Sequence, residues 1–171
     1  TGFVRMPAQV SIVMPVRNVA PYLRENLASI AAQTYTDFEL IAVDDHSSDE
    51  TRAILSSAAE TDNRIRILEN TGKGLVPALN TGMKAARGEF IARMDGDDFM
   101  PPERLRLQAD YLMRQSSAAV VTGHVEHWGG VETAGYSRYV DFINSLHTPE
   151  DYCLRQFVES PVAHPSVMLR R

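Results

Sequence analysis

The sequence predicts an α/β protein whose mostly parallel sheet carries helices on both faces. Apolar runs rich in valine and isoleucine alternate with stretches in which apolar residues recur every three or four positions, the pattern of strands alternating with helices. Acidic and polar residues follow three of the predicted strands. Ligands of such sheets bind outside the carboxyl ends of the strands, so we expect these residues to form the functional site.

Length and charge restrict the class of protein. At 171 residues the chain suits one domain, and we expect residues 1–171 to form it. The net charge of -5 argues against nucleic acid as a partner, and no run approaches the roughly 18 apolar residues of a membrane span. The single cysteine, Cys153, excludes an internal disulfide and favours a reducing compartment such as the cytoplasm.

Residues 9–16 form the first predicted strand, because the run is rich in β-branched residues and is closed by Pro15. Asn18 is expected to cap the helix that follows. The apolar stripe of that helix comprises Leu23, Leu27, Ile30 and Ala31.

Residues 38–43 form the second predicted strand. Ser47 and Glu50 stand at capping-box spacing, which predicts the start of a second helix. Residues 64–68 alternate like a third strand. The second helix is expected to pack through Ile54, Leu55, Ala58 and Ala59.

Residues 76–87 form the third predicted helix, with Gly88 as its C-cap. Gly82 inside it costs about 1 kcal/mol relative to alanine, so we expect close packing at that position. A fourth strand follows, and Pro102 then begins a fourth helix. The fourth strand ends at what we call the acidic turn, which consists of Asp95, Gly96, Asp97 and Asp98.

The remaining chain predicts a mixture of short elements. Residues 118–123 are expected to form a strand and residues 124–133 a hairpin. A helix is expected to start at Thr148 and to continue through Phe157 and Val158. Residues 161–171 have no helical stripe, which predicts a loop and a strand.

The residues that follow the first, second and fourth strands should meet, because the carboxyl ends of parallel strands lie at one edge of a sheet. They are residues 15–18, Asp44 with Asp45, and the acidic turn. For Asp44, a structural role ahead of the second helix and a role in the site are both open.

Three carboxylates at a strand end are costly to fold unless a cation shares their charge. Mg2+ and Mn2+ prefer oxygen ligands, usually one or two carboxylates completed by water and substrate phosphate. The acidic turn therefore predicts a divalent metal site. A calcium loop is excluded, because its third acidic ligand and its glycine would fall on Phe99 and Met100. A solvated turn, and an aspartyl phosphatase with Asp95 as nucleophile and Asp97 as acid, remain alternatives.

Six segments follow one another along the chain: SIVMPVRN (11–18), SIAAQTY (29–35), ELIAVDDHSSD (39–49), GKGLVPALN (72–80), ARGEFIARMDGDD (86–98) and AHPSVM (163–168). In this order they resemble the motifs of family two glycosyltransferases, which have the GT-A fold of nucleotide-diphospho-sugar transferases. Each segment is weak alone, whereas the ordered set covers most of the chain and is specific.

The resemblance implies a site for a nucleotide-sugar donor, with a UDP-sugar as first choice and dTDP and GDP donors left open. Pro15, Arg17 and Asn18 would lie against the nucleoside. Asp45 would accept a hydrogen bond from the base. Lys73 would meet the diphosphate as a point charge, from a loop that closes over the nucleotide in this family.

In the same resemblance the acidic turn is the family's Asp-x-Asp (DXD) motif. Asp97 would ligate Mn2+ or Mg2+ directly, Asp95 would lie nearer the ribose or behind the ligand, and Asp98 would support them. The cation would stabilise the charge that grows on the departing diphosphate.

The implied reaction is inverting transfer of a hexosyl-type sugar to the hydroxyl of a glycan or lipid-linked acceptor, in polysaccharide biosynthesis at the bacterial cell envelope. It needs a general base, usually Asp or Glu. That base is expected beyond Arg171, so no residue of this chain is assigned as catalytic. We therefore expect the donor-binding N-terminal portion of a longer enzyme, in the cytoplasm or held at the inner face of the membrane by segments outside this chain. Whether an exposed sheet edge makes it a homodimer is left open.

Two other functions remain as alternatives. One is a nucleotide-sugar-binding module without transfer activity. The other is a sugar-phosphate nucleotidyltransferase, which normally has a glycine-rich basic loop that residues 14–18 do not supply. The segment around Lys73 is not a Walker loop, because the residue five places before Gly72 is Ile67 and no Ser or Thr follows the lysine. A flexible loop and a phosphate contact are equally open there.

Three histidines and the tryptophan are further candidates. His124 and His127, three apart on a predicted strand, point to opposite faces and cannot chelate without a bend, so we interpret them as structural or surface residues. His164 is interpreted first as a buried, hydrogen-bonded residue and second as an acceptor-side contact. Trp128 is interpreted as a core or loop anchor rather than a platform for a sugar.

Overall fold

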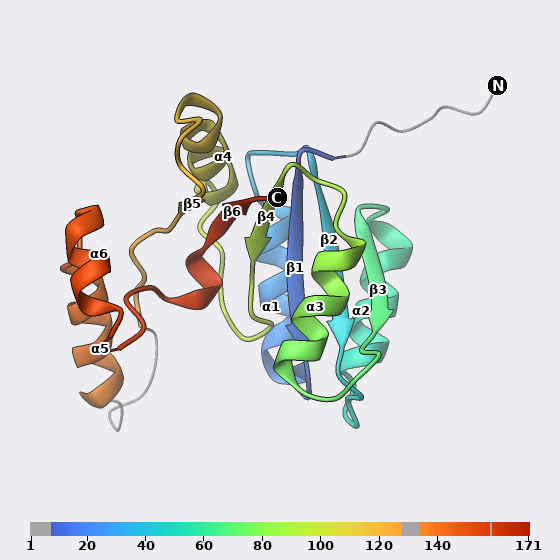
Figure 1. Ribbon diagram of the computed structural model, residues 1–171. Coiled ribbons are helices and arrows are strands. Elements are labelled where there is room, and N and C mark those ends of the chain that lie inside the picture. Colours follow the sequence, from blue (N-terminus) through green and yellow to red (C-terminus); the bar gives the residue numbers. More distant parts are fainter. Residues whose placement is uncertain (1–7, 128–133, 158) are drawn as a thin grey trace.

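The computed structural model describes residues 8–127, 134–157 and 159–171. Its six strands form one sheet in the order β3-β2-β1-β4-β6-β5 (Figure 1). The first four strands in the chain run parallel, and β6 runs antiparallel to both β4 and β5. The predicted fold class is therefore confirmed. The strands are β1 (Val10–Val16), β2 (Phe38–Asp44), β3 (Ile65–Glu69), β4 (Phe90–Arg93), β5 (Val120–Val121) and β6 (Met168–Arg170).

Helices cover both faces of the sheet. Val13 of β1 packs in a cluster with Ala78 of α3, whereas Ile12 and Met14 pack on the opposite face in a cluster with residues of α1, α2 and α4. All residues of β1 and β2 are buried, as expected for central strands covered on both faces. The helices are α1 (Ala20–Ala31), α2 (Thr51–Thr61), α3 (Leu75–Ala85), α4 (Arg104–Arg114), α5 (Ala134–Asn144) and α6 (Pro149–Arg155), with a 3-10 turn η1 (His164–Ser166).

Two glycines near the sheet have different explanations. A Cβ on Gly82 would lie 2.5 Å from Cγ1 of Val13, so the predicted close packing of α3 on β1 is confirmed. Gly88 is not a helix C-cap, because α3 ends at Ala85. A Cβ there would lie 2.7 Å from the backbone nitrogen of Ser11, so Gly88 allows the chain to pass against the start of β1.

The predicted caps of the first two helices are wrong. Val19, and not Asn18, is the N-cap of α1, and it makes no side-chain cap bond. Ser47 and Glu50 form no capping box, since Glu50 is itself the N-cap of α2. Asp49 serves both helices instead. Its Oδ2 accepts from the first N–H of α1 at 3.1 Å, and its Oδ1 accepts from the first N–H of α2 at 3.0 Å.

The C-terminal third departs most from the predictions. The strand expected over residues 118–123 is only two residues long. Residues 124–127 have no regular structure, so this part of the predicted hairpin is wrong, and the rest of the hairpin lies outside the described residues. The unpredicted helix α5 is anchored by Tyr139, whose hydroxyl donates to the carbonyls of Ser160 and Val162 at 3.2 and 3.3 Å.

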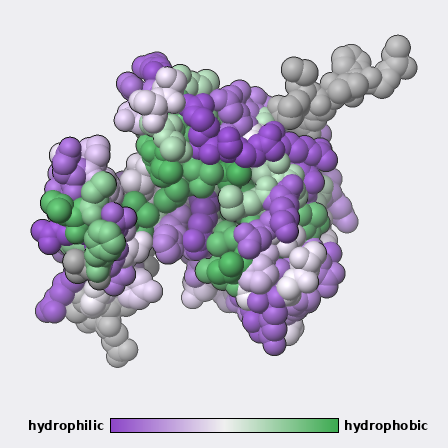
Figure 2. Space-filling view, in the orientation of Figure 1, coloured by the Kyte–Doolittle hydropathy of each residue, from purple (hydrophilic) through white to green (hydrophobic). Residues whose placement is uncertain are grey.

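The helix start predicted at Thr148 is confirmed: Thr148 is the N-cap of α6 and forms a reciprocal capping box with Asp151. The helix ends at Arg155, however, and so does not reach Phe157 as predicted; the rest of the prediction, Val158, lies outside the described residues. Phe157 is 88% exposed, and Figure 2 shows hydrophobic residues at the surface of the lobe that carries α5 and α6. Within the described ranges, no helix combines the length and the apolarity needed to cross a bilayer.

Candidate functional site

The candidate site lies where β1 and β4 separate at their carboxyl ends. The chain winds from β1 to β2 and β3 on one side and then crosses to β4 on the other, so the strand order reverses at this boundary. β1 pairs with β2 through Val16 but with β4 only through Val13. The shorter ladder fits the absence of an N–H on Pro15, the next residue on that side of β1. The loops that follow β1, β2 and β4 therefore share one rim.

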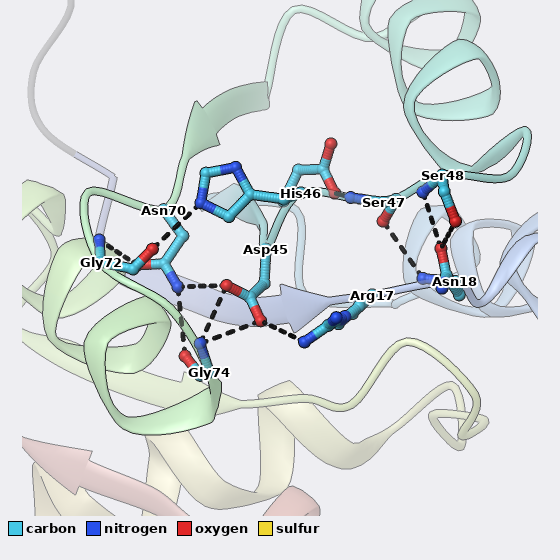
Figure 3. Close-up of polar contacts among 10 residues, drawn as sticks. Arg17, Asn18, Asp45, His46, Ser47, Ser48, Asn70, Gly72 and Gly74 are labelled. Carbon is cyan, nitrogen blue, oxygen red and sulfur yellow. Dashed lines mark hydrogen bonds and ion pairs between the residues drawn. The ribbon is translucent and has the colours of Figure 1, made fainter.

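Asp45 lies at the centre of the contacts in Figure 3 and is 5% exposed. Its Oδ1 accepts from Nδ2 of Asn70 at 2.6 Å, and both of its oxygens accept from the N–H of Gly74 at 3.0 Å. Nη1 of Arg17 lies 3.5 Å from Oδ2. Burial alone would raise the pKa of the Asp45 carboxyl, but these donors and the charge of Arg17 hold that pKa below its ordinary value. Asp45 is therefore an ionised acceptor.

The loop between β3 and α3 is anchored to Asp45. Asn70 is 3% exposed, and its amide also donates to the carbonyl of Gly74 at 3.1 Å and accepts from the N–H of Gly72 at 3.0 Å. Gly74 has φ of 93°, a conformation that favours glycine. Lys73 is exposed between these two anchored glycines. The loop thus presents an exposed cationic side chain from an anchored backbone.

Pro15, Arg17 and Asn18, at the end of β1 and just after it, differ in exposure. Pro15 is buried within β1, and Arg17 is exposed on the rim. Asn18 has φ of 53°, and its Oδ1 accepts from the N–H of Ser48 at 2.8 Å. Its own N–H donates to Oγ of Ser47 at 3.1 Å (Figure 3). Asn18 therefore joins the loop after β1 to the loop after β2.

The contacts of Asp44 favour its structural interpretation. The side chain is buried, and its Oδ1 accepts from the N–H of Ser47 at 3.1 Å. Nη1 of Arg52 lies 3.7 Å from the other oxygen. Asp44 thus orders the entry into α2.

The acidic turn places its three carboxylates in different surroundings. Asp95 forms an ion pair with Arg93, whose Nε and Nη2 donate to its two carboxylate oxygens at 3.1 and 3.3 Å. Asp97 is exposed and Asp98 is partly buried. A Cβ on Gly96 would lie 2.8 Å from Cγ1 of Val16, so the turn packs against the end of β1 and needs a glycine at its centre.

A second arginine lies behind the turn. Arg104 donates through Nη2 to the carbonyls of Arg93 and Val167, at 2.9 and 3.3 Å. Burial lowers the pKa of Arg104 to about 10, against the opposing charges of Asp98 and Asp95. Burial and the charges of the two neighbouring aspartates raise the pKa of Asp98 from 3.8 to about 6, against the smaller effects of Arg104 and Arg93.

The donor set of the turn fits a hard divalent cation that is completed by a ligand. Among the described residues, no three His, Cys, Asp or Glu side chains come close enough to hold a metal ion by themselves. Mg2+ and Mn2+ usually take only one or two carboxylates and complete their coordination with water and phosphate. Asp97 offers an exposed carboxylate, and a cation there would relieve the repulsion that raises the pKa of Asp98.

The histidine pair does not form a chelating group. The ring of His124 lies 5.4 Å from that of His147, and the ring of His127 stacks on Tyr136 at 5.3 Å. These contacts support the structural interpretation, although the strand on which it rested is absent. Trp128 lies outside the described residues.

His164 is exposed rather than buried, so the first interpretation of this residue is wrong. Its Nε2 lies 3.3 Å from Oγ of Ser160. A contact on the acceptor side stays a prediction. Cys153 is also exposed.

Sequence reasoning did not identify the two arginines or the residues of α1 that contact the turn. A usable signal existed for Arg93, because it precedes Asp95 by two residues at the end of β4, and side chains two apart face the same side wherever the chain stays extended. Arg104 gave no such signal, since its carbonyl partners come from β4 and from the segment before β6. Asn26 of α1 donates to the carbonyls of Asp95 and Asp98, which are about 70 residues away in sequence.

Comparisons with known proteins agree with this geometry. Glycosyltransferase EpsJ of Bacillus subtilis, described as uncharacterised, is 43% identical over 91 residues, which are 53% of this chain and 26% of that protein. A mannosyltransferase of Pyrobaculum calidifontis, solved with GDP-Man and Mn2+, is 28% identical with a TM-score of 0.64, over 72% of this chain and 37% of that one. S. aureus TarS, solved with UDP-GlcNAc, is 27% identical with a TM-score of 0.62, over the same shares. The matches span between 19% and 48% of the curated relatives' length.

A family model decides between the alternatives. The model described as glycosyl transferase family 2 matches residues 11–171. This match and the structural neighbours replace the phosphatase and nucleotidyltransferase interpretations, and the fold is that of the GT-A glycosyltransferases. The chain belongs to glycosyl transferase family 2.

Proposed function

We propose that this chain binds the nucleoside diphosphate of a sugar donor, with a UDP-sugar as the first candidate, at the rim formed after β1, β2 and β4. The observation that carries the proposal is the placement of Arg17, Asp45 and the acidic turn after three adjacent strands, at the reversal of strand order. The solved neighbours that hold UDP-GlcNAc, or GDP-Man with Mn2+, support it.

In this proposal Asp45 accepts a hydrogen bond from the base, since its carboxyl stays ionised despite burial. Arg17 lies beside the nucleoside and keeps Asp45 charged. Lys73 meets the diphosphate from the loop above α3.

Asp97 and Asp98 would hold Mn2+ or Mg2+, and Asp95, already paired with Arg93, would stand behind them. The cation supplies Lewis-acid stabilisation of the charge on the departing diphosphate. The side chains at the rim would hold the leaving group in one orientation, so that their charges face the oxygens on which negative charge develops. Inverting transfer to a glycan or lipid-linked hydroxyl is the reaction this binding would serve, and no residue here is assigned as its general base.

Calorimetric titration with UDP tests the proposal. Binding should require Mn2+ or Mg2+, should be abolished by EDTA, and should weaken by about 10-fold or more in Asp97→Asn. Asp141→Asn, an exposed acid on α5, is the matched control and should bind like the wild type. Binding that ignores the cation, or equal affinity of the two variants, would contradict the proposal. Competition by dTDP and GDP identifies the preferred base.

A further inference from the structure

Helix α1 carries a polar stripe that its packing on the sheet does not require. Asn26 and Ser29 are three residues apart and so share one face of α1, and Gln33 follows two residues beyond the end of the helix; these three residues are the polar stripe. Asn26 is fully buried and Gln33 is 3% exposed. Buried amides and hydroxyls cost stability unless they find partners, so their partners indicate what the stripe does.

Asn26 bridges the two ends of the acidic turn. Its Nδ2 donates to the carbonyl of Asp95 at 2.9 Å and to the carbonyl of Asp98 at 2.7 Å. The turn is closed by the N–H of Asp98, which donates to the carbonyl of Asp95 at 3.3 Å. Oδ1 of Asn26 is buried without a hydrogen-bond partner among the described residues. The Oδ1 of Asn26 therefore makes no stabilising hydrogen bond. The two bonds donated by Nδ2 are the contacts that explain why an asparagine is buried at this position.

Ser29 and Gln33 hold the segment that leaves the turn. Oγ of Ser29 accepts from the N–H of Met100 at 3.1 Å. Nε2 of Gln33 donates to the carbonyl of Pro101 at 2.7 Å, and its Oε1 accepts from the N–H of Leu105 at 3.1 Å. The stripe thus contacts the backbone at successive points from the acidic turn to the first turn of α4.

We propose that Asn26, Ser29 and Gln33 are positioning residues for the acidic turn. Their contacts to the turn and to its exit are all with backbone groups, so they fix the path of the chain and thereby the direction in which Asp97 and Asp98 project. Ser29 and Gln33 belong to the 29–35 motif, and Asn26 precedes it by three residues. The proposed contacts with the donor do not explain these three residues. The use of UDP as the test ligand rests on the proposed function. The positioning role itself rests only on the hydrogen bonds to the backbone.

Two buried variants at opposite ends of the sheet separate positioning from stability. Asn26→Leu keeps the branched shape and the number of heavy atoms of asparagine, with larger methyl groups in place of the polar atoms, and removes both donors together with the unpaired acceptor. Ser11→Ala is the control, because Ser11 is also fully buried and its hydroxyl joins Glu39 and the N–H of Gly88 at 2.8 Å each, at the opposite end of β1. We expect Asn26→Leu to weaken UDP binding in Mn2+ by about 10- to 100-fold. Ser11→Ala should lower the melting temperature and leave that affinity unchanged.

A second readout needs no ligand. Amide hydrogen exchange of Asp98 and Met100 should accelerate in Asn26→Leu. Exchange of the β1 amides should change only as far as the global stability of the variant changes. Ser29→Ala, a milder change, should accelerate Met100 and leave Asp98 nearly unchanged. This result supports positioning even if the wild-type protein fails to bind UDP, which would overturn only the proposed function. Unchanged exchange in both variants, or an affinity loss in Ser11→Ala equal to that in Asn26→Leu, would overturn the positioning role.

Discussion

Asp98→Asn is expected to stabilise the cation-free protein at neutral pH and to lose that advantage in acid. Burial and the charges of Asp97 and Asp95 raise the pKa of Asp98 from 3.8 to about 6, although Arg104 and Arg93 oppose them. The folded protein therefore takes up a proton at Asp98 more readily than the unfolded chain does. Ionised Asp98 destabilises the fold above pH 6, and this cost fades as the pH falls from about 6 to below 4.

The size of the effect follows from the two pKa values. A rise from 3.8 to about 6 corresponds to about 3 kcal/mol, at 1.36 kcal/mol for each pKa unit. Asp98 is only partly buried, so solvent screening should reduce the effect to about 1–2 kcal/mol. Asparagine has nearly the same volume as aspartate, and so the substitution should leave the packing of the turn intact.

Urea denaturation in EDTA, from pH 8 to pH 4, measures this difference. Asp98→Asn should be more stable than the wild type at pH 8, and the two free energies of unfolding should converge by pH 4. Asp141→Asn, an exposed control on α5, should follow the wild type throughout. A variant that is less stable at pH 8, or a difference that does not change with pH, would refute the reasoning.

Three further perturbations test other parts of the account. Gly82→Ala should cost about 1–2 kcal/mol in urea denaturation, because the contact with Val13 outweighs the helix propensity that alanine adds, and a more stable variant would contradict this. Asp45→Asn should weaken UDP binding by at least about tenfold in calorimetry, since its amide cannot accept from Gly74 through both atoms, and wild-type affinity would contradict the role of Asp45. Thr148→Ala should cost about 1 kcal/mol and speed amide exchange in α6, whereas unchanged exchange there would show that the capping box is not needed.

The sheet could be predicted because its signal is local. All residues of β1 and β2 are buried, so continuous apolar runs mark them without any knowledge of their neighbours. The cost of Gly82 in a helix likewise indicated close packing, which the contact with Val13 confirms. The order of the motifs predicted the family, which the match over residues 11–171 shows.

The predictions that failed depend on partners distant in sequence. Asn18 and Ser47 each have the chemistry of a helix cap, but they bond to each other's loops, and Asp49 takes over both helix starts. Gly88 follows α3, but a glycine is needed there because the chain passes close to the backbone of β1. No local rule distinguishes these uses of the same residue types.

The candidate site shows the same division. The carboxylates at strand ends could be read from the sequence, because they follow apolar runs. Arg104 and Asn26 could not be identified, because each acts on backbone carbonyls, which any sequence supplies. The loop contacts of Asp45 were also beyond prediction, since they depend on the φ of 93° at Gly74.

The most direct test of the donor site is paramagnetic broadening of backbone amide signals by Mn2+ in the presence of UDP. The amides of Gly96, Asp97 and Asp98 should broaden first, followed by those after β1 and in the loop that carries Lys73. Amides at the start of β3 should keep their intensity, and EDTA should reverse the effect. Broadening centred away from the acidic turn, or none at concentrations at which UDP binds, would contradict the assignment of this rim as a cation-dependent diphosphate site.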